Sequence, residues 1–271
     1  MKIIFLKIFY IYNTMKYKKI LLGIRTFSSC WLLSIKKINQ PNIILCDFDN
    51  ELEKTIEINN IDYIIPLSKQ DYDIVKKTIY KDKILYPSEE NIELLNNKLN
   101  FTKFMLKEFE NFIPKVYYLK NNIIEKNILF PLISKPIFST NGLNMRIIKN
   151  NNELNMCKNK MIIQEYIDFD YEYSAFFLCI EGKIINIKIL KKIFPKYHIK
   201  KSNFVDYIEV NDFPIEILEE LTIKLKYTGG GNIDFKYNET NKKIYIFEFN
   251  PRFGGSAFTN DFIYELLCIE N

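Results

Sequence analysis

Two acidic residues interrupt apolar runs near the C-terminal end of the sequence. Asp234 lies within the run 232–237 and Glu248 within the run 243–249, and a short polar segment separates the runs. This pattern is typical of a β-hairpin with a short loop. A turn at the centre of the polar segment places the two carboxylates opposite one another, with Asn250 on the face of Glu248. The sequence therefore predicts a cluster of oxygen ligands.

Oxygen ligands of this kind favour a hard cation. A carboxylate buried without a partner costs several kcal/mol, so each acid is expected to be protonated, paired with a cation or bound to a metal. Two carboxylates and an amide, with no His or Cys nearby, are suited to an ion such as Mg²⁺. The alternative is a structural hairpin whose acids pair with neighbouring lysines.

An arginine and a small-residue turn follow the predicted cluster. Arg252 comes two residues after Asn250, and only three of the 38 Lys and Arg residues in the chain are Arg. A planar guanidinium binds phosphate in a fixed geometry. Gly254, Gly255 and Ser256 let backbone N–H groups approach an anion. These residues predict an anion-binding group beside the metal ligands.

The stretch 229–256 resembles the C-terminal signature of the ATP-grasp superfamily. In that signature an acid on one strand precedes Glu-x-Asn-x-Arg on the next, and a Gly-rich turn follows. The matching residues here are Asp234, Glu248, Asn250 and Arg252. The resemblance implies that two Mg²⁺ ions, with Mn²⁺ as an alternative, bridge the phosphates of ATP, and that Glu248 is shared between the two ions.

A second informative stretch surrounds Lys135. The lysine follows an apolar run, and the small polar residues 139–142 come after it. A lysine at the end of a buried strand, followed by a flexible loop, is suited to hold a phosphate. The arrangement resembles the ATP-grasp strand lysine and its Gly-rich flap, although Gly142 is the single glycine here. The resemblance implies that Lys135, Ser139 and Gly142 contact phosphate and that Lys135 and Arg252 are catalytic.

A helix expected over 97–111 carries a third candidate. Asn97 and Lys98 resemble the Asp-Lys pair that begins the first helix of ATP-grasp domains, with Asn97 in place of the acid. The resemblance implies that Lys98 contacts phosphate. The alternative is a solvated helix lysine.

The run 161–167 resembles the hinge strand between the two lobes that hold ATP in this superfamily. Its backbone would bind the edge of adenine, and Glu172 would bind the ribose hydroxyls. The implied nucleotide contacts are Gln164, Glu165, Tyr166, Ile167 and Glu172. A hairpin is expected over 171–180 and 183–190, followed by a basic run at Lys188, Lys191 and Lys192. That run faces either a ligand, which would be phosphate or an acidic substrate, or solvent.

The N-terminal part alternates short apolar runs with helical patterns. This order predicts an α/β fold with a small, doubly wound parallel sheet. No GxGxxG follows the first strand, which disfavours a dinucleotide-binding domain. The expected strands are 19–24, 42–46, 61–66 and 84–86, and the expected helices are 27–38 and 71–80, with a further helix over 212–227 near the other end of the chain.

Composition narrows the class of protein. The 271 residues are 48% hydrophobic and 26% charged, as in globular proteins. A net charge of +5 without a long basic run argues against nucleic acid as a partner. Five scattered cysteines suggest neither zinc nor a disulfide framework and fit a reducing cytoplasm. The apolar stretch 1–14 is too short to cross a membrane, and His198 alone cannot provide a histidine-based metal site.

We therefore expect an ATP-grasp fold preceded by a small pre-ATP-grasp domain. The expected parts are an extension over 1–14, the pre-ATP-grasp domain over 15–95 and the ATP-grasp domain over 96–271. Within the last, a lid lobe covers about 112–168 and a C-terminal lobe, shorter than in relatives, about 169–271. The sequence looks most similar to the carbamoyl-phosphate-synthase-like and carboxylate-amine ligase branches of the superfamily. The implied activity is an ATP- and Mg²⁺-dependent ligase that joins a small carboxylate to an amine or another nucleophile through an acyl phosphate, as a monomer or homo-oligomer. The alternative is an inactive nucleotide-binding protein that acts as a sensor or partner subunit.

Overall fold

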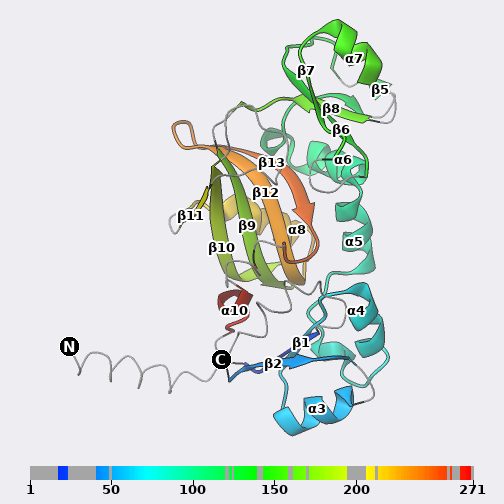
Figure 1. Ribbon diagram of the computed structural model, residues 1–271, viewed down its shortest axis with the longest axis vertical. Coiled ribbons are helices and arrows are strands. Elements are labelled where there is room, and N and C mark those ends of the chain that lie inside the picture. Colours follow the sequence, from blue (N-terminus) through cyan, green and yellow to red (C-terminus); the bar gives the residue numbers. More distant parts are fainter. Residues whose placement is uncertain are drawn as a thin grey trace, which may run out of the picture.

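The computed structural model describes residues 18–23, 41–48, 51–119, 122–123, 125–138, 143–157, 161–168, 171–193, 206–210, 213–254, 257 and 263–269. These residues form three β-sheets, arranged one after another along the long axis of the molecule (Figure 1). The predicted features at 1–14, 27–38, Ser139, Gly142 and His198 lie outside the described residues. Within the described ranges, no helix has both the length and the apolar character that a bilayer span requires.

The first sheet, here called the N-terminal sheet, has three parallel strands in the order β2-β1-β3. The predicted parallel α/β arrangement is confirmed, but the strand expected at 84–86 is reduced to a single bridge between Ile64 and Ile84. Helix α3 was not predicted. The elements are β1 (Ile20–Gly23), β2 (Ile43–Cys46), α3 (Leu52–Asn59), β3 (Tyr63–Ile65) and α4 (Lys69–Val75), with a 3₁₀ turn at Lys81–Lys83.

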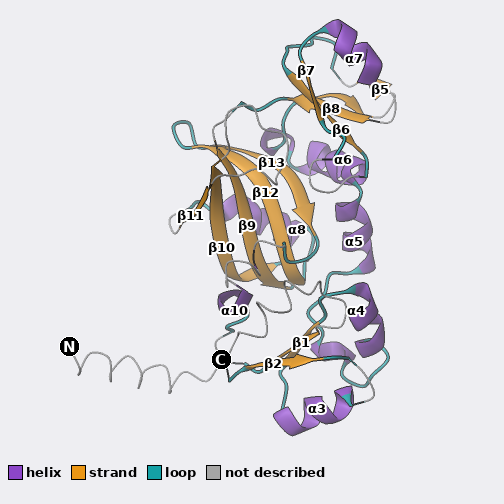
Figure 2. Cartoon of the chain, viewed as in Figure 1, coloured by secondary structure: helices purple, strands orange, loops and turns teal. Residues whose placement is uncertain are grey.

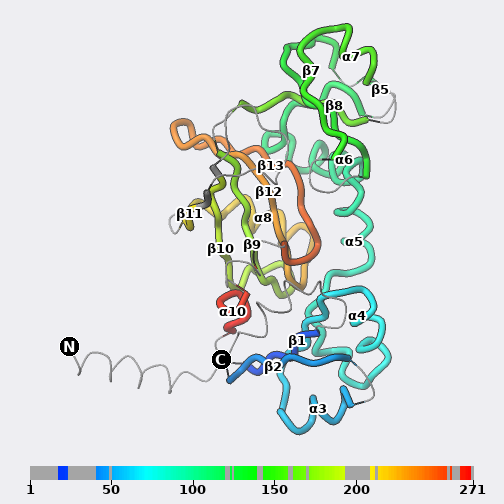
Figure 3. Tube along the Cα trace, in the orientation of Figure 1, coloured from blue at the N-terminus to red at the C-terminus, as the bar shows by residue number. Residues whose placement is uncertain are grey.

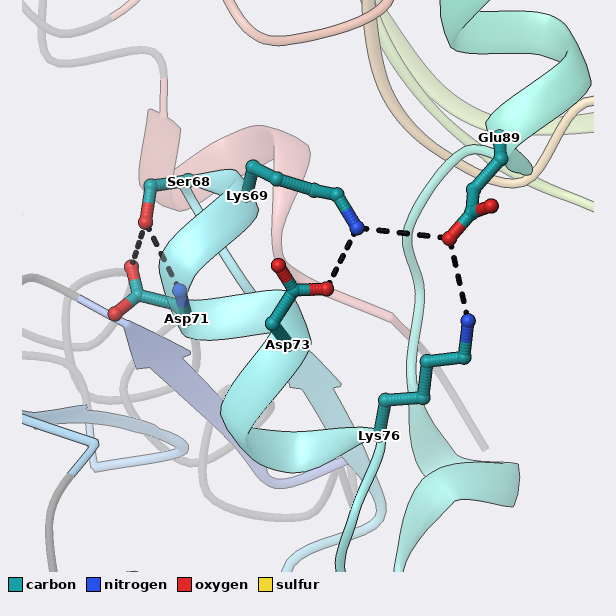
Figure 4. A network of polar contacts seen from close by, with 6 residues as sticks. All are labelled: Ser68, Lys69, Asp71, Asp73, Lys76 and Glu89. Carbon is teal, nitrogen blue, oxygen red and sulfur yellow. Dashed lines mark hydrogen bonds and ion pairs between the residues drawn. The ribbon is translucent and has the colours of Figure 1, made fainter.

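Helices α5 (Glu89–Asn96) and α6 (Lys98–Glu108) lead from the N-terminal sheet to the second sheet (Figure 2). Glu89, at the start of α5, accepts from Lys69 at 3.5 Å and from Lys76 at 3.2 Å, so two cations of the α4 region hold this end of α5 (Figure 4). In the same network, Ser68 caps α4 by accepting from the backbone N–H of Asp71. Exposed pairs contribute little stability each, so they orient α5 more than they stabilise it.

The second sheet, here called the lid sheet, is antiparallel with the order β5-β4-β8-β6-β7. Helix α7 covers one of its faces, where Leu154 packs with Leu132, Ile148 and Ile163. The elements are β4 (Val116–Leu119), β5 (Asn122–Ile123), β6 (Leu132–Pro136), β7 (Arg146–Ile148), α7 (Asn151–Cys157) and β8 (Met161–Glu165), after a 3₁₀ turn at Glu110–Phe112.

The third sheet, here called the large sheet, is antiparallel with the order β11-β10-β9-β12-β13. Alternating residues of β9 and β12, among them Ala175, Phe177 and Ile233, pack with Leu218 and Leu221 of α8. Helix α8 therefore covers one face, and the chain returns to the same sheet through β12 and β13 (Figure 3). The elements are β9 (Tyr171–Ile180), β10 (Lys183–Ile193), β11 (Asp206–Val210), α8 (Glu216–Lys224), β12 (Gly229–Asn238), β13 (Lys243–Asn250) and α10 (Ile263–Leu266).

Candidate active site

The predicted acidic hairpin is formed by β12 and β13. Asp234 pairs directly with Glu248, and Asn232 pairs with Asn250. Directly paired residues share a face of the sheet, so the predicted opposition of the two carboxylates is confirmed. Asp234 is only 2% exposed. The hairpin thus gathers two carboxylates and two amides on the face of the large sheet that α8 does not cover.

Asp234 belongs to a buried polar network that extends across three strands. Ser174 Oγ on β9 donates to Asp234 Oδ1, and Lys192 on β10 donates to Ser174 Oγ. The Nζ of Lys192 lies 3.2 Å from Asp234 Oδ1 and 3.8 Å from Glu172 Oε1. Lys192 is 7% exposed, so a solvated face, one of the two alternatives for the basic run, is wrong for this lysine.

Glu248 has a cationic partner from a different element. Lys98, the first residue of α6, places Nζ 2.8 Å from Glu248 Oε1, and the two side chains are 14% and 22% exposed. The helix start is well defined because the side chain of Asn97 accepts from the backbone N–H groups of Leu99 and Asn100. Asn97 therefore provides a side-chain cap. Lys98 is an ion-paired lysine and not a solvated one.

Lys135 connects the lid sheet to the large sheet. It lies on β6, is 6% exposed, and places Nζ 4.8 Å from the ring centroid of Phe247 on β13. The backbone N–H of Lys98 donates to the carbonyl of Ile137, just beyond the end of β6, at 3.2 Å. These contacts place Lys98 and Lys135 where the lid sheet meets the hairpin, as a phosphate-binding pair requires.

The predicted hinge joins β8 to β9, and its backbone is partly engaged within the chain. Tyr166 N–H donates to Pro131 O at 3.2 Å, and Lys236 Nζ donates to Ile167 O at 2.8 Å. Gln164 is buried and Glu165 is half-buried. A base bound here must use the remaining backbone groups of the hinge or displace Lys236.

A hollow of about 590 Å³ lies beside the hinge at the β7 edge of the lid sheet. Tyr166 and Asp168 line it from the hinge, and Arg146, Ile147 and Met156 line it from β7 and α7. Of the predicted nucleotide contacts that the structure describes, only Tyr166 belongs to this lining. The acids of the hairpin lie elsewhere, so the hollow and the hairpin are separate features.

Glu172 and Arg252 lie on either side of the hairpin strands. The Oε1 atom of Glu172 is buried and has no hydrogen-bond partner, apart from the longer ion-pair contact with Lys192. Arg252 is exposed and donates through Nη1 to Asn96 Oδ1, at the end of α5, at 3.2 Å. The unsatisfied carboxylate oxygen fits a hydroxyl donor from a ligand, and the exposed guanidinium is accessible to an anion.

The donor set of the hairpin fits a hard divalent cation. Its oxygen donors come from Asp234, Glu248 and Asn250, and each of the two acids also accepts from a lysine ammonium group. In the described part of the chain, no three His, Cys, Asp or Glu residues form a closed metal cluster by themselves. A metal here would therefore need oxygen atoms from another source, and phosphate provides them.

Two residues of the site, Ser174 and Lys236, were not predicted, and Lys192 was predicted only as part of a basic run with two alternative environments. Ser174 shares the face of Glu172, two residues earlier, which is a signal that strand alternation offers. The two lysines carry little signal in a chain with 38 Lys and Arg residues. Their importance depends on strand pairing between segments that are distant in sequence.

Comparisons with known proteins agree with this arrangement. A sequence model of the ATP-grasp domain family matches residues 95–256. Curated relatives are the formate-dependent phosphoribosylglycinamide formyltransferases of Prochlorococcus marinus strains NATL1A and NATL2A, which are 27% and 26% identical over 152 residues. That alignment covers 50% of this chain and 39% of each relative, so the chain matches well under half of their length.

Solved structures share the fold at low sequence identity. Biotin carboxylase from Campylobacter jejuni, in a βγ-ATP complex, has a TM-score of 0.55 at 18% identity, covering 93% of this chain and 69% of that one. N5-carboxyaminoimidazole synthetase from Staphylococcus aureus, complexed with ADP, has a TM-score of 0.53 at 16% sequence identity. The alignment covers 90% of this chain and 72% of that one. L-amino acid ligase from Bacillus licheniformis has a TM-score of 0.51 at 17% sequence identity, and the alignment covers 93% of this chain and 71% of that one. Since the family match also spans more than half of the sequence, this chain belongs to the ATP-grasp domain family.

Proposed function

We propose that this chain is an ATP- and Mg²⁺-dependent ligase that joins a small carboxylate to an amine or another nucleophile. The observation that carries the proposal is the pairing of Asp234 with Glu248, each held by a lysine from a different element. Relatives named as a formate-dependent formyltransferase and an L-amino acid ligase support the substrate class. A cytoplasmic location is supported by the five cysteines of the sequence, which are scattered and include no CxxC pair.

The hairpin would hold the metal. Asp234, Glu248 and Asn250 would provide protein oxygens for two Mg²⁺ ions, with Mn²⁺ as a substitute, and the phosphates would complete the coordination. When bound, the metal neutralises the charge that develops on the transferred phosphoryl group. The residues of the chain hold these oxygens in place before the nucleotide arrives, since β12 and β13 fix the register of both acids.

The nucleotide would lie between the lid sheet and the large sheet. The backbone of Lys98 bonds to Ile137 O, and Lys135 Nζ lies over the ring of Phe247, so both lysines are near this boundary, which supports their assignment as phosphate contacts. Ser139 and Gly142 are assigned to the same phosphates from the family resemblance alone. Adenine would contact the hinge residues Gln164, Glu165, Tyr166 and Ile167. Glu172, with its unsatisfied buried oxygen, would accept from the ribose hydroxyls.

The proposed reaction has two steps. A carboxylate oxygen of the substrate attacks the γ-phosphorus of ATP, the bond to the β,γ-bridging oxygen breaks, and ADP leaves with that oxygen. The amine then attacks the acyl carbon, inorganic phosphate leaves, and the amine proton is released to solvent. Arg252, exposed beside the hairpin, would orient the substrate carboxylate and the transferred phosphoryl group.

Hydroxylamine trapping tests this proposal. The full chain is incubated with Mg·ATP, hydroxylamine and a panel of carboxylates that includes formate and amino acids. An acyl phosphate is expected to give a hydroxamate with stoichiometric ADP, and Glu248→Gln should give neither. Binding of Mg·ATP without hydroxamate or ADP from any carboxylate would favour the alternative, a nucleotide-binding protein without ligase activity.

A further inference from the structure

A row of charged and polar side chains crosses one face of the large sheet. Lys192 on β10 pairs in register with Glu172 on β9, and Ser174 on β9 pairs in register with Asp234 on β12. Residues two apart on one strand share a face. The four side chains therefore lie on the same face, with the lysine able to reach both acids.

The ammonium group of Lys192 occupies the cation position beside Asp234. It lies 3.2 Å from Asp234 Oδ1, and both residues are almost fully buried. A divalent cation on this carboxylate would be repelled strongly by an ammonium at such a distance, since few water molecules can screen the two charges. A metal ion at Asp234 Oδ1 would therefore compete with Lys192 for this oxygen.

The structure also offers the displaced ammonium a nearby counter-charge. Glu172 Oε1 lies 3.8 Å from Lys192 Nζ and has no hydrogen-bond partner. Rotation within the flexible lysine stem brings Nζ to hydrogen-bond distance of this oxygen without moving the strand. The negative charge of a bound triphosphate would favour the displaced position further.

We propose that Lys192 is a positioning residue that holds Asp234 and is displaced from this carboxylate when metal binds. A metal ion alone is then expected to bind weakly, because it competes with the ammonium of Lys192 for Asp234. A metal ion together with nucleotide is expected to bind more tightly, because the charge of the triphosphate favours the displaced lysine. This inference rests on the proposed function, since it takes Asp234 as a metal ligand. The ion pair of Lys98 with Glu248 gives the second acid of the hairpin a similar partner.

Titration with Mn²⁺ alone tests the inference. Free Mn²⁺ is measured by electron paramagnetic resonance with the full chain, its Lys192→Gln variant, and Lys191→Gln as the matched control. Lys191 is adjacent, points to the opposite face and pairs with the exposed Glu239. Lys192→Gln should bind Mn²⁺ about tenfold more tightly than the wild type, because a buried carboxylate has lost its partner. Equal or weaker binding by a folded Lys192→Gln would overturn the inference.

The wild-type chain provides a second test that does not depend on a variant that folds. Reductive methylation followed by mass spectrometry compares the reactivity of individual lysines with and without saturating MnCl₂. Because the ammonium of Lys192 exchanges Asp234 for Glu172 when Mn²⁺ binds, its reactivity should change, and that of Lys191 should stay the same. Unchanged reactivity of Lys192 at a Mn²⁺ concentration where binding is measured would overturn the inference.

Different results would contradict the role of Lys192 and the proposed nucleotide site. If the wild type binds Mn·ATP and Glu248→Gln does not, the nucleotide site is supported. If Mn²⁺ binding by Lys192→Gln and the reactivity of Lys192 both stay unchanged in that case, only the proposed displacement of Lys192 is wrong. If the wild type binds no Mn·ATP, the proposed function is wrong.

Discussion

Lys98 Nζ lies 2.8 Å from Glu248 Oε1, although the two residues are 150 positions apart in the chain. The lysine begins helix α6, and the glutamate lies on β13 of the large sheet. The pair therefore connects the segment that leads into the lid sheet with the proposed metal ligands. Because both side chains are mostly buried, its electrostatic interaction is stronger than that of a surface pair.

Replacing Lys98 should weaken nucleotide binding. Lys98→Gln removes a cation that we assign to phosphate, so the affinity for Mg·ATP in calorimetry should fall by about tenfold or more. Lys103→Gln, an exposed lysine on the same helix, is the control and should bind like the wild type. A folded Lys98→Gln protein with wild-type affinity would remove Lys98 from the site.

Glu172 should distinguish nucleotides by their ribose hydroxyls. Glu172→Gln replaces the charged acceptor, and a hydrogen bond to a charged group contributes about 1.5–3 kcal/mol. The variant should therefore lose about tenfold or more in affinity for ATP and little for 2′,3′-dideoxy-ATP. An equal loss for both nucleotides would show that Glu172 acts through Lys192 or the fold, and not through the ribose.

The glycine run before the hairpin should tolerate no side chain. A Cβ atom on Gly231 would lie 2.4 Å from Cζ of Phe177, which is fully buried against α8 and β13. Gly231→Ala should lower the free energy of unfolding by roughly 1–3 kcal/mol, as overpacking does in other cores. Lys243→Ala, at an exposed strand end, should change it by at most about 0.5 kcal/mol. Denaturant unfolding measures both, and equal stability of the two variants would contradict the packing described.

The ion pair between α6 and α8 should make stability depend on acid pH. Hydrogen bonds from Lys224 and Lys107 lower the pKa of Glu108 to about 2 from its ordinary value of 4.5. A lowered folded-state pKa stabilises the fold above the unfolded value, and the contribution is lost as the pH falls toward 2. The melting temperature of the wild type should therefore fall more than that of Glu108→Gln between pH 4.5 and pH 2. High salt should shrink the difference, and a difference that persists in salt would contradict this cause.

The acidic hairpin could be predicted from the sequence because its information is local. Alternation in two apolar runs fixes which side chains share a face, and a short polar segment fixes the turn. The pairing of Asp234 with Glu248 also needs a β-bulge at Phe247, because the register set by the turn would place Asp234 opposite Phe247, and local alternation does not predict this bulge. The N-cap at Asn97 is local in the same way.

The burial of Lys192 and the presence of helix α3 depend on contacts between distant segments, which local sequence patterns do not show. Lys192 is one of many lysines, and its burial becomes visible only when β9, β10 and β12 lie side by side. Helix α3 was missed because it is eight residues long and its N-cap, Glu51, makes no side-chain cap hydrogen bond. Its buried residues, Leu52 and Ile56, are fixed by packing on the N-terminal sheet.

We propose that the β12–β13 hairpin binds the metal that carries the nucleotide. Calorimetric titration of Mg·ATP into the full chain, with Glu248→Gln alongside, tests it most directly. The substitution keeps the shape of the side chain and removes its charge, so circular dichroism should show an intact fold while Mg·ATP binding falls by about tenfold or more. Wild-type affinity in a folded Glu248→Gln protein would contradict the metal site.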